Sequence, residues 1–368
     1  MKIENHSLVQ RVSAEKKYEA ELEALKVNDK DPSPKGWNLS PRAVRRFILG
    51  DKTLGVSQKF FGDDPLVDRC IVSLMGQQGL MLVGEPGTAK SLLSELLAAA
   101  ISGTSGLIVQ GSAGIIEDHL RYGWNYALLL AEGPSEKALV PSPILSAMQK
   151  GQIARVEELT RCAPEVQDAM ISLLSEKTVA IPELGSEVAV QAVPGFNVIA
   201  TSNLRDRGVH DMSSALKRRF NFETVHPISN ASFEKELISK QLDEKLAEHD
   251  VEPKMSPETL DVLVNVFRDL RTGKTTDGAS VAIPNSVMST AEAVNVAYSA
   301  ALDAAYLDDK ALSGRHIARQ LSGVVFKDDQ EDARKLRAYV DHIAKVRAKK
   351  SKAWKAFYTT AKSELDQS

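Results

Sequence analysis

The chain has little of what marks secreted or membrane proteins. Its 368 residues contain two cysteines, Cys70 and Cys162, whose spacing fits no metal site. We expect both to be buried as small apolar side chains in a reducing compartment. No apolar run approaches the length of a membrane span, and Met1–His6 lacks the apolar core of a signal peptide. These absences argue against a disulfide framework and a membrane span, and they predict a cytoplasmic protein.

No charge of one sign dominates the composition. Lys and Arg number 46 against 49 Asp and Glu, so the net charge is −3 and the whole molecule has no nucleic-acid footprint. Hydrophobic residues make up 43% and charged residues 26%, as in an ordinary globular protein. The length predicts two domains, or one large domain with additions.

The most informative stretch is a glycine-rich loop. Gly84-Glu85-Pro86-Gly87-Thr88-Ala89-Lys90-Ser91 fits the phosphate-loop pattern G-x-x-x-x-G-K-[ST]. The glycines allow a tight turn that points N–H groups at phosphate oxygens, Lys90 supplies a positive charge, and the Ser91 hydroxyl can ligate Mg²⁺. The apolar run 80–83 precedes the loop and the helical pattern 92–100 follows it, so strand, loop and helix stand in the required order. A plain glycine turn between two core elements is the alternative that this order disfavours.

Apolar runs and helical patterns alternate along the first part of the chain. Five runs can form strands of a parallel sheet, at Leu80–Val83, Leu107–Gln110, Ile153–Glu158, Phe196–Thr201 and Phe222–Val225. This alternation predicts an α/β layered domain over residues 37–227, with its ligand at the carboxyl ends of the strands. Two insertions are predicted to be β-hairpins, one with arms at 126–130 and 137–140 and one with arms at 178–181 and 187–190.

The ends of the chain have a different character. Residues 1–36 give a weak helical stripe and a polar linker, which predicts an N-terminal extension. After Pro227 the pattern is helical, with a lid-like domain predicted over 228–327. Residues 328–368 are basic, and 331–365 are predicted to form one long C-terminal helix. Its aromatic residues either interleave with the lysines for nucleic acid or pack on the lid; their helical spacing favours packing.

Three further features have the chemistry of nucleotide hydrolysis. Glu157-Glu158 ends the third run, where a carboxylate pair can hold a metal ion and orient water. Asn203 follows the fourth run and can hold that water, although asparagine also favours turns. Arg218-Arg219 end a short helical stretch; they either interact with its dipole or reach a neighbouring subunit's γ-phosphate.

In this order these motifs resemble those of the AAA+ ATPases of the MoxR-like group, together with their chelatase and McrB relatives. The two hairpins are similar to the helix-two and pre-sensor-one inserts of that group. Further similar phrases are Pro141–Leu145 with Gly151–Ile153, Leu159–Pro164 and Ala215–Phe220. The resemblance covers residues 55–325 and leaves 1–36 and the C-terminal helix unmatched.

The resemblance implies a ring, usually hexameric, with ATP bound between subunits. Glu158 is then the catalytic base or water-orienting residue, Asn203 the first sensor, Arg219 the arginine finger and Arg218 its alternative. Mg²⁺ is assigned to Ser91 and Glu157. ATP is assigned to Gly84, Glu85, Pro86, Gly87, Thr88, Ala89, Lys90, Ser91 and Leu92.

Two departures from the family pattern stand out. The family has Asp where Glu157 stands, and Arg155 occupies a strand position that should be apolar. A buried arginine needs a partner, and Glu157 lies two residues on, on the same face of the strand. The stretch Ala279–Ala301 also lacks the arginine expected at the start of the third lid helix. The nearest arginines are Arg271, Arg315 and Arg319.

Three functions are consistent with these observations. The first is a ring-forming ATPase that remodels or activates a partner protein, in the way that MoxR-like members often serve proteins with a von Willebrand factor A domain. The second is a nucleic-acid motor subunit of the McrB type, and the third is a nucleotide-gated scaffold that hydrolyses little ATP. The hairpins, with Trp124, Tyr126 and the turn 133–137, form the predicted working surface unless they merely pack on the sheet.

Overall fold

The computed structural model describes residues 11–203, 208–247, 249, 254–308, 311–325 and 329–367. The first ten residues of the predicted extension and residues 326–328 at the predicted lid boundary lie outside this description. The chain forms two compact units. The first runs to Gly84 and again from Ala89 to Val225; the second comprises Glu85–Thr88 and the chain from His226 onward. None of the described helices is long and apolar enough to cross a membrane.

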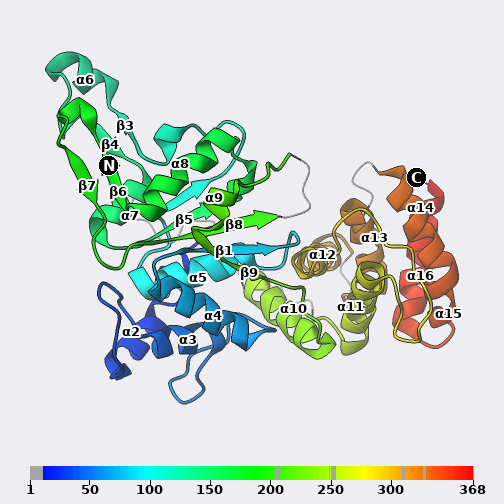
Figure 1. Ribbon diagram of the computed structural model, residues 1–368. Helices are drawn as coiled ribbons and strands as arrows, with labels where there is room; N and C mark the ends of the chain where they lie inside the picture. The colour runs from blue at the N-terminus through cyan, green and yellow to red at the C-terminus, as the bar shows by residue number, and fades with distance from the viewer. Residues whose placement is uncertain are drawn as a thin grey trace. The chain divides into compact units, whose positions relative to one another are not determined.

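A five-stranded parallel sheet forms the centre of the first unit (Figure 1). Its strands lie in the order β2-β5-β8-β1-β9, with bounds Ile108–Gln110, Ile153–Glu157, Asn197–Asn203, Gly79–Gly84 and Phe220–Thr224. All four pairings are parallel, so the five predicted strands are confirmed. The carboxyl ends of β1, β5 and β8 therefore meet at one edge of the sheet.

Alternation along the strands divides the core into two layers. Leu80 and Leu82 of β1 pack on one face with three helices, α3 (Pro41–Leu49), α4 (Asp64–Met75) and α5 (Lys90–Ser102). Met81 and Val83 pack on the other face with α7 (Pro143–Lys150) and α8 (Pro164–Ser175). The sheet is thus covered on both sides, which is why its strands read as continuous apolar runs. Cys70 and Cys162 are buried, one in each layer, and burial raises the pKa of Cys70 to about 12.

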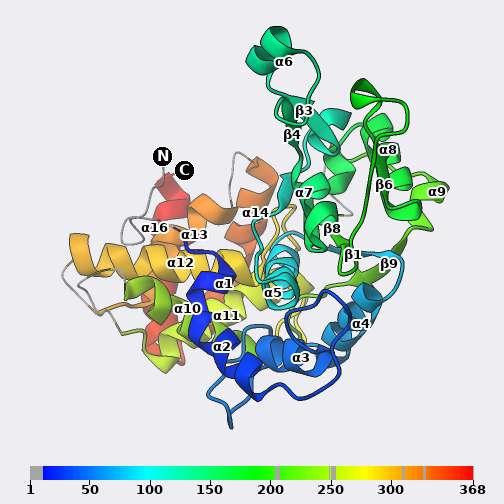
Figure 2. The same ribbon diagram turned by 90° about the vertical axis from the view of Figure 1, so that its left-hand side faces the viewer.

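The N-terminal segment packs as part of the first unit. It forms α1 (Ala14–Lys17) and α2 (Glu19–Asn28), which lie against the layer of α3 and α5 (Figure 2). Leu25 is 1% exposed and belongs to the apolar cluster beneath the sheet. Glu21 accepts hydrogen bonds from the backbone and hydroxyl of Ser57 and pairs with the buried Lys59. The segment that the sequence suggests is an extension therefore supplies core residues.

One predicted hairpin is confirmed and the other is partly wrong. β6 (Thr178–Ala180) and β7 (Ala189–Gln191) pair antiparallel as predicted. In the first insertion the strands are β3 (Tyr122–Trp124) and β4 (Leu139–Pro141), whereas the expected arm 126–130 belongs to helix α6 (Tyr126–Glu132). The Asn125 side chain caps this helix by accepting from the Leu128 N–H, a start signal that a strand reading overlooks.

The second unit is helical among its described residues, apart from a single β-bridge. Its helices are α10 (Ala231–Leu246), α11 (Pro257–Thr272), α12 (Thr290–Leu302) and α13 (Gly314–Val325). Ser256 caps α11 as predicted, and Gly273 ends it. The Ala-rich helix begins at Thr290 rather than Ser286, because Ser289 and Glu292 form a capping box there.

The predicted single C-terminal helix is two helical arms. The first joins α14 (Gln330–Tyr339), a π-helical turn (Val340–Ala344) and α15 (Lys345–Ala348); the second is α16 (Lys352–Gln367). The chain turns between them, which lets α16 lie beside α13 and α15. Trp354 and Phe357 are buried in this core, so the expectation that the aromatic stripe packs is confirmed. The division into a lid at 228–327 and a segment at 328–368 stays a prediction.

A polar cluster fastens these arms to α11. Asp269 accepts from the Tyr339 hydroxyl at 2.9 Å and from Arg347 at 2.7 Å. Burial raises the pKa of Asp269 despite Arg347, and it raises that of Tyr339 well above its usual value. Arg347 also stacks over Trp354, 4.8 Å from the ring centroid. Arg347, one of the basic residues of the C-terminal segment, is therefore fixed by contacts with Asp269 and Trp354.

If α2 is part of the core, truncating its buried side chain destabilises the protein. We expect Leu25→Ala to lower the free energy of unfolding by about 2–5 kcal/mol, because it leaves a cavity beneath the sheet. Val27→Ala on the same helix is the matched control, since Val27 is 72% exposed, and a change within about 0.5 kcal/mol is expected for it. Urea denaturation compares the two; equal effects would mean that α2 does not pack as described.

Candidate functional site

The glycine-rich loop joins the end of β1 to the start of α5. Gly87 has a φ of 74° and Ala89 a φ of 68°, both left-handed. The Thr88 hydroxyl donates to the Glu85 carbonyl at 2.9 Å, which closes the turn. Lys90 is 7% exposed, and its Nζ donates to the Gly84 carbonyl at 3.1 Å, so the ammonium lies at the carboxyl end of β1. Because no side chain caps α5, the first N–H groups of the helix are left to an anion.

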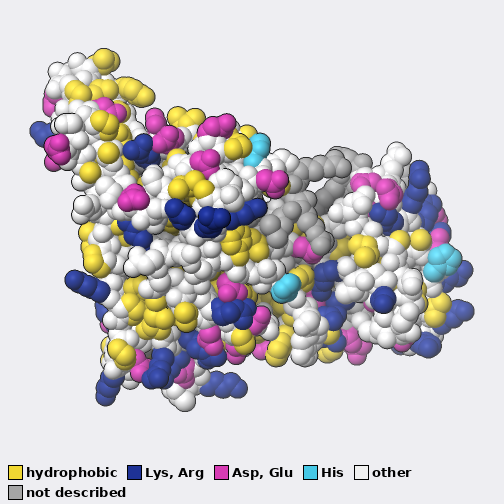
Figure 3. Space-filling view, in the orientation of Figure 1, with side chains coloured by type: hydrophobic (Ala, Val, Ile, Leu, Met, Phe, Trp, Pro, Cys, Tyr) yellow, Lys and Arg dark blue, Asp and Glu magenta, His cyan; other side chains and the backbone are white. Residues whose placement is uncertain are grey.

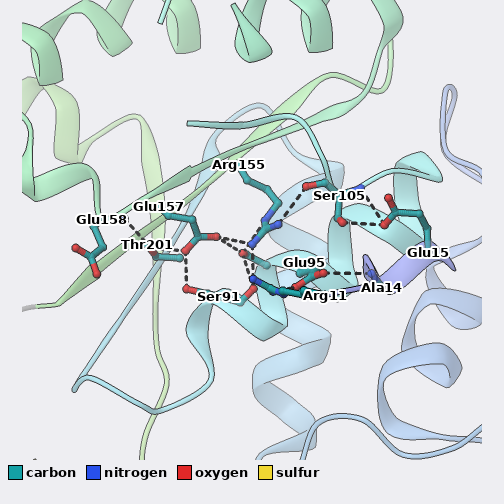
Figure 4. Close-up of polar contacts among 11 residues, drawn as sticks. Arg11, Ala14, Glu15, Ser91, Glu95, Ser105, Arg155, Glu157, Glu158 and Thr201 are labelled. Carbon is teal, nitrogen blue, oxygen red and sulfur yellow. Dashed lines mark hydrogen bonds and ion pairs between the residues drawn. The ribbon is translucent and has the colours of Figure 1, made fainter. Parts of the chain in front are cut away.

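The Glu157 carboxylate is the centre of the polar network next to this loop (Figure 4). Its Oε2 accepts from the Ser91 hydroxyl at 2.7 Å and from the Thr201 hydroxyl at 2.8 Å. Its Oε1 accepts from Ser94 Oγ at 2.6 Å and from Arg155 Nη2 at 2.8 Å. The predicted pairing of Glu157 with Arg155 and the predicted approach of Glu157 to Ser91 are both present.

Burial and these partners act in opposite directions on the pKa of Glu157. Burial is the largest influence and raises the pKa. The hydrogen bond from Ser94, the charge of Arg155 and the hydroxyls of Ser91 and Thr201 together outweigh it, so the pKa lies below its usual value. The carboxylate is therefore ionised at neutral pH, as a metal ligand must be.

Glu158 leaves the strand and points away from Glu157. Its φ is 54°, a left-handed conformation that turns the chain at the end of β5. Its carboxylate pairs with Arg161 at 2.8 Å, and Asn203 Nδ2 lies 3.5 Å from Oε1, the outer limit of a hydrogen bond. The structure thus brings Glu158 and Asn203 together at the carboxyl edge of the sheet. Sequence reasoning did not identify Arg161 as a partner of Glu158.

Two supporting residues also escaped sequence reasoning. Thr201 joins the two glutamates, because its hydroxyl donates to Glu157 and accepts from the Glu158 backbone N–H at 2.9 Å. Gly111 follows β2, and its N–H donates to the Glu157 carbonyl at 2.7 Å. A Cβ at Gly111 would come within 2.3 Å of the Glu158 carbonyl oxygen. A threonine inside a strand and a glycine after one are too common in sequences to signal either role.

Arg218 and Arg219 lie at the opposite edge of the sheet. They follow α9 (Ser214–Lys217) and precede β9, whose first residue Phe220 stands in register with Gly79 at the start of β1. Arg219 Nε donates to Ser175 Oγ at 2.6 Å, and Arg218 is exposed. The structure does not bring these arginines to the loop, which lies at the other end of β1.

The three arginines considered for the lid bind acids of the second unit. Arg271 pairs with the fully buried Glu234 and donates to the Met288 carbonyl. Arg315 pairs with Asp308. Arg319 pairs with Asp303. Arg268, which the sequence did not single out, is a second partner of Glu234. The sensor-two role stays unassigned.

The residues at the loop fit a nucleotide with Mg²⁺. The loop offers a buried ammonium and an uncapped helix start to phosphate oxygens. Ser91 and Glu157 offer a hydroxyl and an ionised carboxylate 2.7 Å apart. Mg²⁺ takes oxygen ligands and usually keeps waters and phosphates besides one or two protein groups. Within the described part of the chain, no three His, Cys, Asp or Glu side chains gather as an all-protein metal site.

Two family models match the chain. Residues 79–220 match the AAA domain of the dynein-related subfamily, which spans the sheet from β1 to the start of β9. Residues 232–364 match the YehL-like AAA+ ATPase C-terminal domain, which spans the helical unit and both C-terminal arms.

Relatives of known sequence agree with these matches. "Uncharacterized protein YehL" of Escherichia coli (strain K12) is 46% identical over 355 residues, which are 96% of this chain and 97% of the relative. An uncharacterized protein of Staphylococcus aureus (strain USA300) is 32% identical over 143 residues, 39% of this chain and 53% of its own. Among solved structures, NtrX from Brucella abortus in complex with ADP has a TM-score of 0.47 at 14% identity, covering 69% of this chain and 53% of that chain. This structural likeness is too weak to bear on function.

The near full-length similarity to YehL and the two domain matches agree with the loop and the acidic residues at the edge of the sheet. The chain belongs to the AAA+ ATPase family, in the group with a YehL-like C-terminal domain.

Proposed function

We propose that the protein is a Mg²⁺-dependent ATPase that assembles into a ring, with six subunits as the expected number, and remodels or activates a partner protein. The observation that supports this proposal most is that the residues assigned to ATP hydrolysis lie in two groups at opposite edges of the sheet. The loop, Glu157, Glu158 and Asn203 lie at the carboxyl edge of the sheet, and Arg218-Arg219 lie at the amino edge. A complete site then needs two subunits.

The residues at the carboxyl edge have distinct roles in this proposal. Lys90 and the loop N–H groups bind the β- and γ-phosphates. Ser91 and Glu157 would hold Mg²⁺, which would offset the negative charge that develops on the phosphates during transfer. Glu158 orients and deprotonates the attacking water, and Asn203 holds that water toward the γ-phosphate. Arg161 keeps the Glu158 carboxylate in place meanwhile.

Distance argues that the arginines act on a neighbouring subunit. β1 has six residues, and a strand rises about 3.3 Å per residue, so its two ends lie roughly 17–20 Å apart. Arg219 comes directly before the strand that pairs with the start of β1, so its own loop is beyond its reach. In a ring, the same arginine faces the next subunit's γ-phosphate, where it stabilises the transition state.

The proposed turnover is slow. The arginines considered for the lid are already paired with acids, and Glu157 is longer than the Asp of the family pattern. These observations also motivate a second candidate, a scaffold that binds ATP and hydrolyses little. Single-turnover kinetics separates the two, because a scaffold retains bound ATP without forming ADP.

The first insertion is the proposed working surface. Helix α6 has no buried residue, and its Tyr126 and Leu130 are 72% and 88% exposed. Figure 3 shows hydrophobic side chains on the surface that α6 forms at the upper left. Exposed apolar side chains gathered on one projection favour a binding role over simple packing on the sheet. The proposed partner is a protein, with a von Willebrand factor A domain as the expected type.

A nucleic-acid motor is less well supported. That alternative depended on aromatic residues of the C-terminal segment being available to stack on bases. Trp354 and Phe357 are instead 7% and 0% exposed. Of the lysines on α16, Lys352 and Lys355 are exposed and Lys362 pairs with Asp341, so a solvated helix face accounts for them.

The central test removes the proposed base. We expect Glu158→Gln to lower the rate of ATP hydrolysis by about 10²–10⁴-fold while ATP still binds, because the amide cannot accept a proton. Lys90→Ala is the comparison, since it should lose binding itself. Steady-state hydrolysis and nucleotide titration give the two quantities. Unchanged hydrolysis in Glu158→Gln would remove Glu158 from the catalytic role.

A mixing experiment tests the shared site. We expect Arg219→Ala to lower turnover on the order of 10³-fold, because the transition-state charge loses its cation. Mixing Arg219→Ala with Lys90→Ala should restore activity, since Lys90→Ala subunits still present Arg219 to intact loops. Arg218→Ala is the matched neighbour and should have the smaller effect. A mixture as inactive as its components would contradict sites formed between subunits.

The working surface is tested without disturbing the nucleotide site. We expect Leu130→Asp alone to leave the free energy of unfolding and the rate of ATP hydrolysis unchanged. When it is added to the Glu158→Gln protein loaded with ATP, it should abolish capture of the partner. Val72→Asp on α4, where Val72 is 61% exposed, is the control and should capture normally. Equal capture by both variants would mean that α6 is not the binding surface.

A further inference from the structure

A buried arginine stands in the middle of the nucleotide-binding sheet. Arg155 lies on β5, between β2 and β8, and is 5% exposed. An arginine cannot lose its charge, and a buried charge is tolerated only when it is paired and hydrogen-bonded. The burial of Arg155 therefore depends on the groups that its guanidinium contacts.

The guanidinium joins three separate pieces of the first unit. Nε donates to Ser94 Oγ at 3.0 Å and Nη2 to the Ser91 carbonyl at 3.1 Å, so two contacts reach α5. Nη1 donates to the Ser105 carbonyl at 3.1 Å, in the loop after α5. Nη2 also pairs with Glu157 Oε1 at 2.8 Å. Arg155 thus connects the proposed metal carboxylate to the helix that carries the proposed metal hydroxyl.

The two oxygens of Glu157 have different partners. Oε1 is bound by Arg155 and Ser94, whereas Oε2 is bound by the hydroxyls of Ser91 and Thr201. Because Ser91 is the residue assigned to Mg²⁺, Oε2, which accepts from Ser91, would be the oxygen that ligates the metal. Arg155 holds the far oxygen, which removes the rotational freedom of a side chain one methylene longer than Asp.

A second set of contacts connects Arg155 to the N-terminal segment (Figure 4). Glu15 Oε2 accepts from the Ser105 backbone N–H at 3.2 Å and from its hydroxyl at 2.7 Å. Glu95 on α5 accepts from Arg11 at 2.6 Å and from the Ala14 N–H at 3.1 Å. The loop that supplies a carbonyl to Arg155 is therefore held by a residue of α1.

We propose that Arg155 is a positioning residue that fixes the Glu157 carboxylate for Mg²⁺, and that α1 holds Arg155 through the contact of Glu15 with Ser105. The inference rests on the proposed function, since it concerns the metal of that nucleotide site. This role explains why an arginine and the longer acid occur together on β5. Arg155 restrains the longer side chain, and Glu157 is the counter-ion of the buried guanidinium. A change in the N-terminal segment then alters how strongly Mg²⁺ strengthens ATP binding.

The experiment measures the gain in ATP affinity on adding Mg²⁺. The full-length protein is titrated with ATP calorimetrically, once in EDTA and once with excess MgCl₂, and the ratio of the two Kd values is the gain. We expect Arg155→Leu to reduce this gain by about 10–100-fold, as loss of a partner that orients a metal ligand does. Its Kd in EDTA should stay within about twofold of the original, because Arg155 contacts the loop only at the Ser91 carbonyl, which binds no phosphate. Arg45→Leu, at an exposed arginine paired with Asp68, should keep the original gain.

Two more variants keep the test decisive if Arg155→Leu does not fold. Arg155→Leu combined with Glu157→Asp restores the apolar-and-Asp pattern of the family, and it should regain more of the Mg²⁺ effect than Glu157→Asp alone. Glu15→Ala leaves the pair intact and should reduce the gain in the same direction, with folding checked by circular dichroism. Additive effects of the two β5 substitutions would contradict their mutual dependence. An original gain in Glu15→Ala would remove α1 from the proposal.

Two outcomes distinguish an error in the proposed function from an error in the role of Arg155. If the unsubstituted protein shows no gain in ATP affinity with Mg²⁺, the proposed function is wrong at this site. If it shows the gain and Arg155→Leu, folded, shows the same gain, then Arg155 only stabilises the fold and the positioning role is wrong.

Discussion

The arrangement of the nucleotide site depends on one buried carboxylate with four hydrogen-bond donors. Glu157 pays the cost of burial only because hydroxyls and a guanidinium surround it. These donors come from three places that are distant in the sequence: α5, β5 itself and β8. The carboxylate thus fixes the spacing between the loop helix and the middle of the sheet. Removal of Arg155 would leave the carboxylate buried without its counter-ion, and removal of the carboxylate would leave Arg155 buried in the same way.

Most of the first unit follows from local patterns. The five strands are short apolar runs buried on both faces, and their order along the chain placed the loop, the acidic pair and Asn203 at one edge. The pairing of Arg155 with Glu157 followed from strand periodicity alone, because residues two apart share a face. Such features are encoded within a few consecutive residues, which is why they could be predicted.

The features that could not be predicted depend on contacts between distant segments. Leu25 lies in a weak stripe, and only the packing of α2 on α3 reveals that this helix is part of the core. The C-terminal arms share one helical stripe whether the chain is straight or folded back, so periodicity could not locate the turn at 349–351. Tyr126–Leu130 is a short apolar run, which fits a strand as well as a helix until the cap at Asn125 is considered. The contacts of Thr201 and Gly111 with Glu157 and Glu158 could not be predicted either, because no sequence spacing indicates them.

Gly111 has a consequence for how the protein can vary. An edge strand normally accepts many side chains, since one of its sides faces solvent and its neighbours can adjust. Here the chain just beyond β2 passes so close to the Glu158 carbonyl that a methyl group would displace it. Glu158 is already in a left-handed turn, so the displaced backbone has little room to relax. Gly111 is therefore a position at this edge of the sheet that accepts no side chain. A change as small as Gly111→Ala would alter the direction in which Glu158 leaves the sheet.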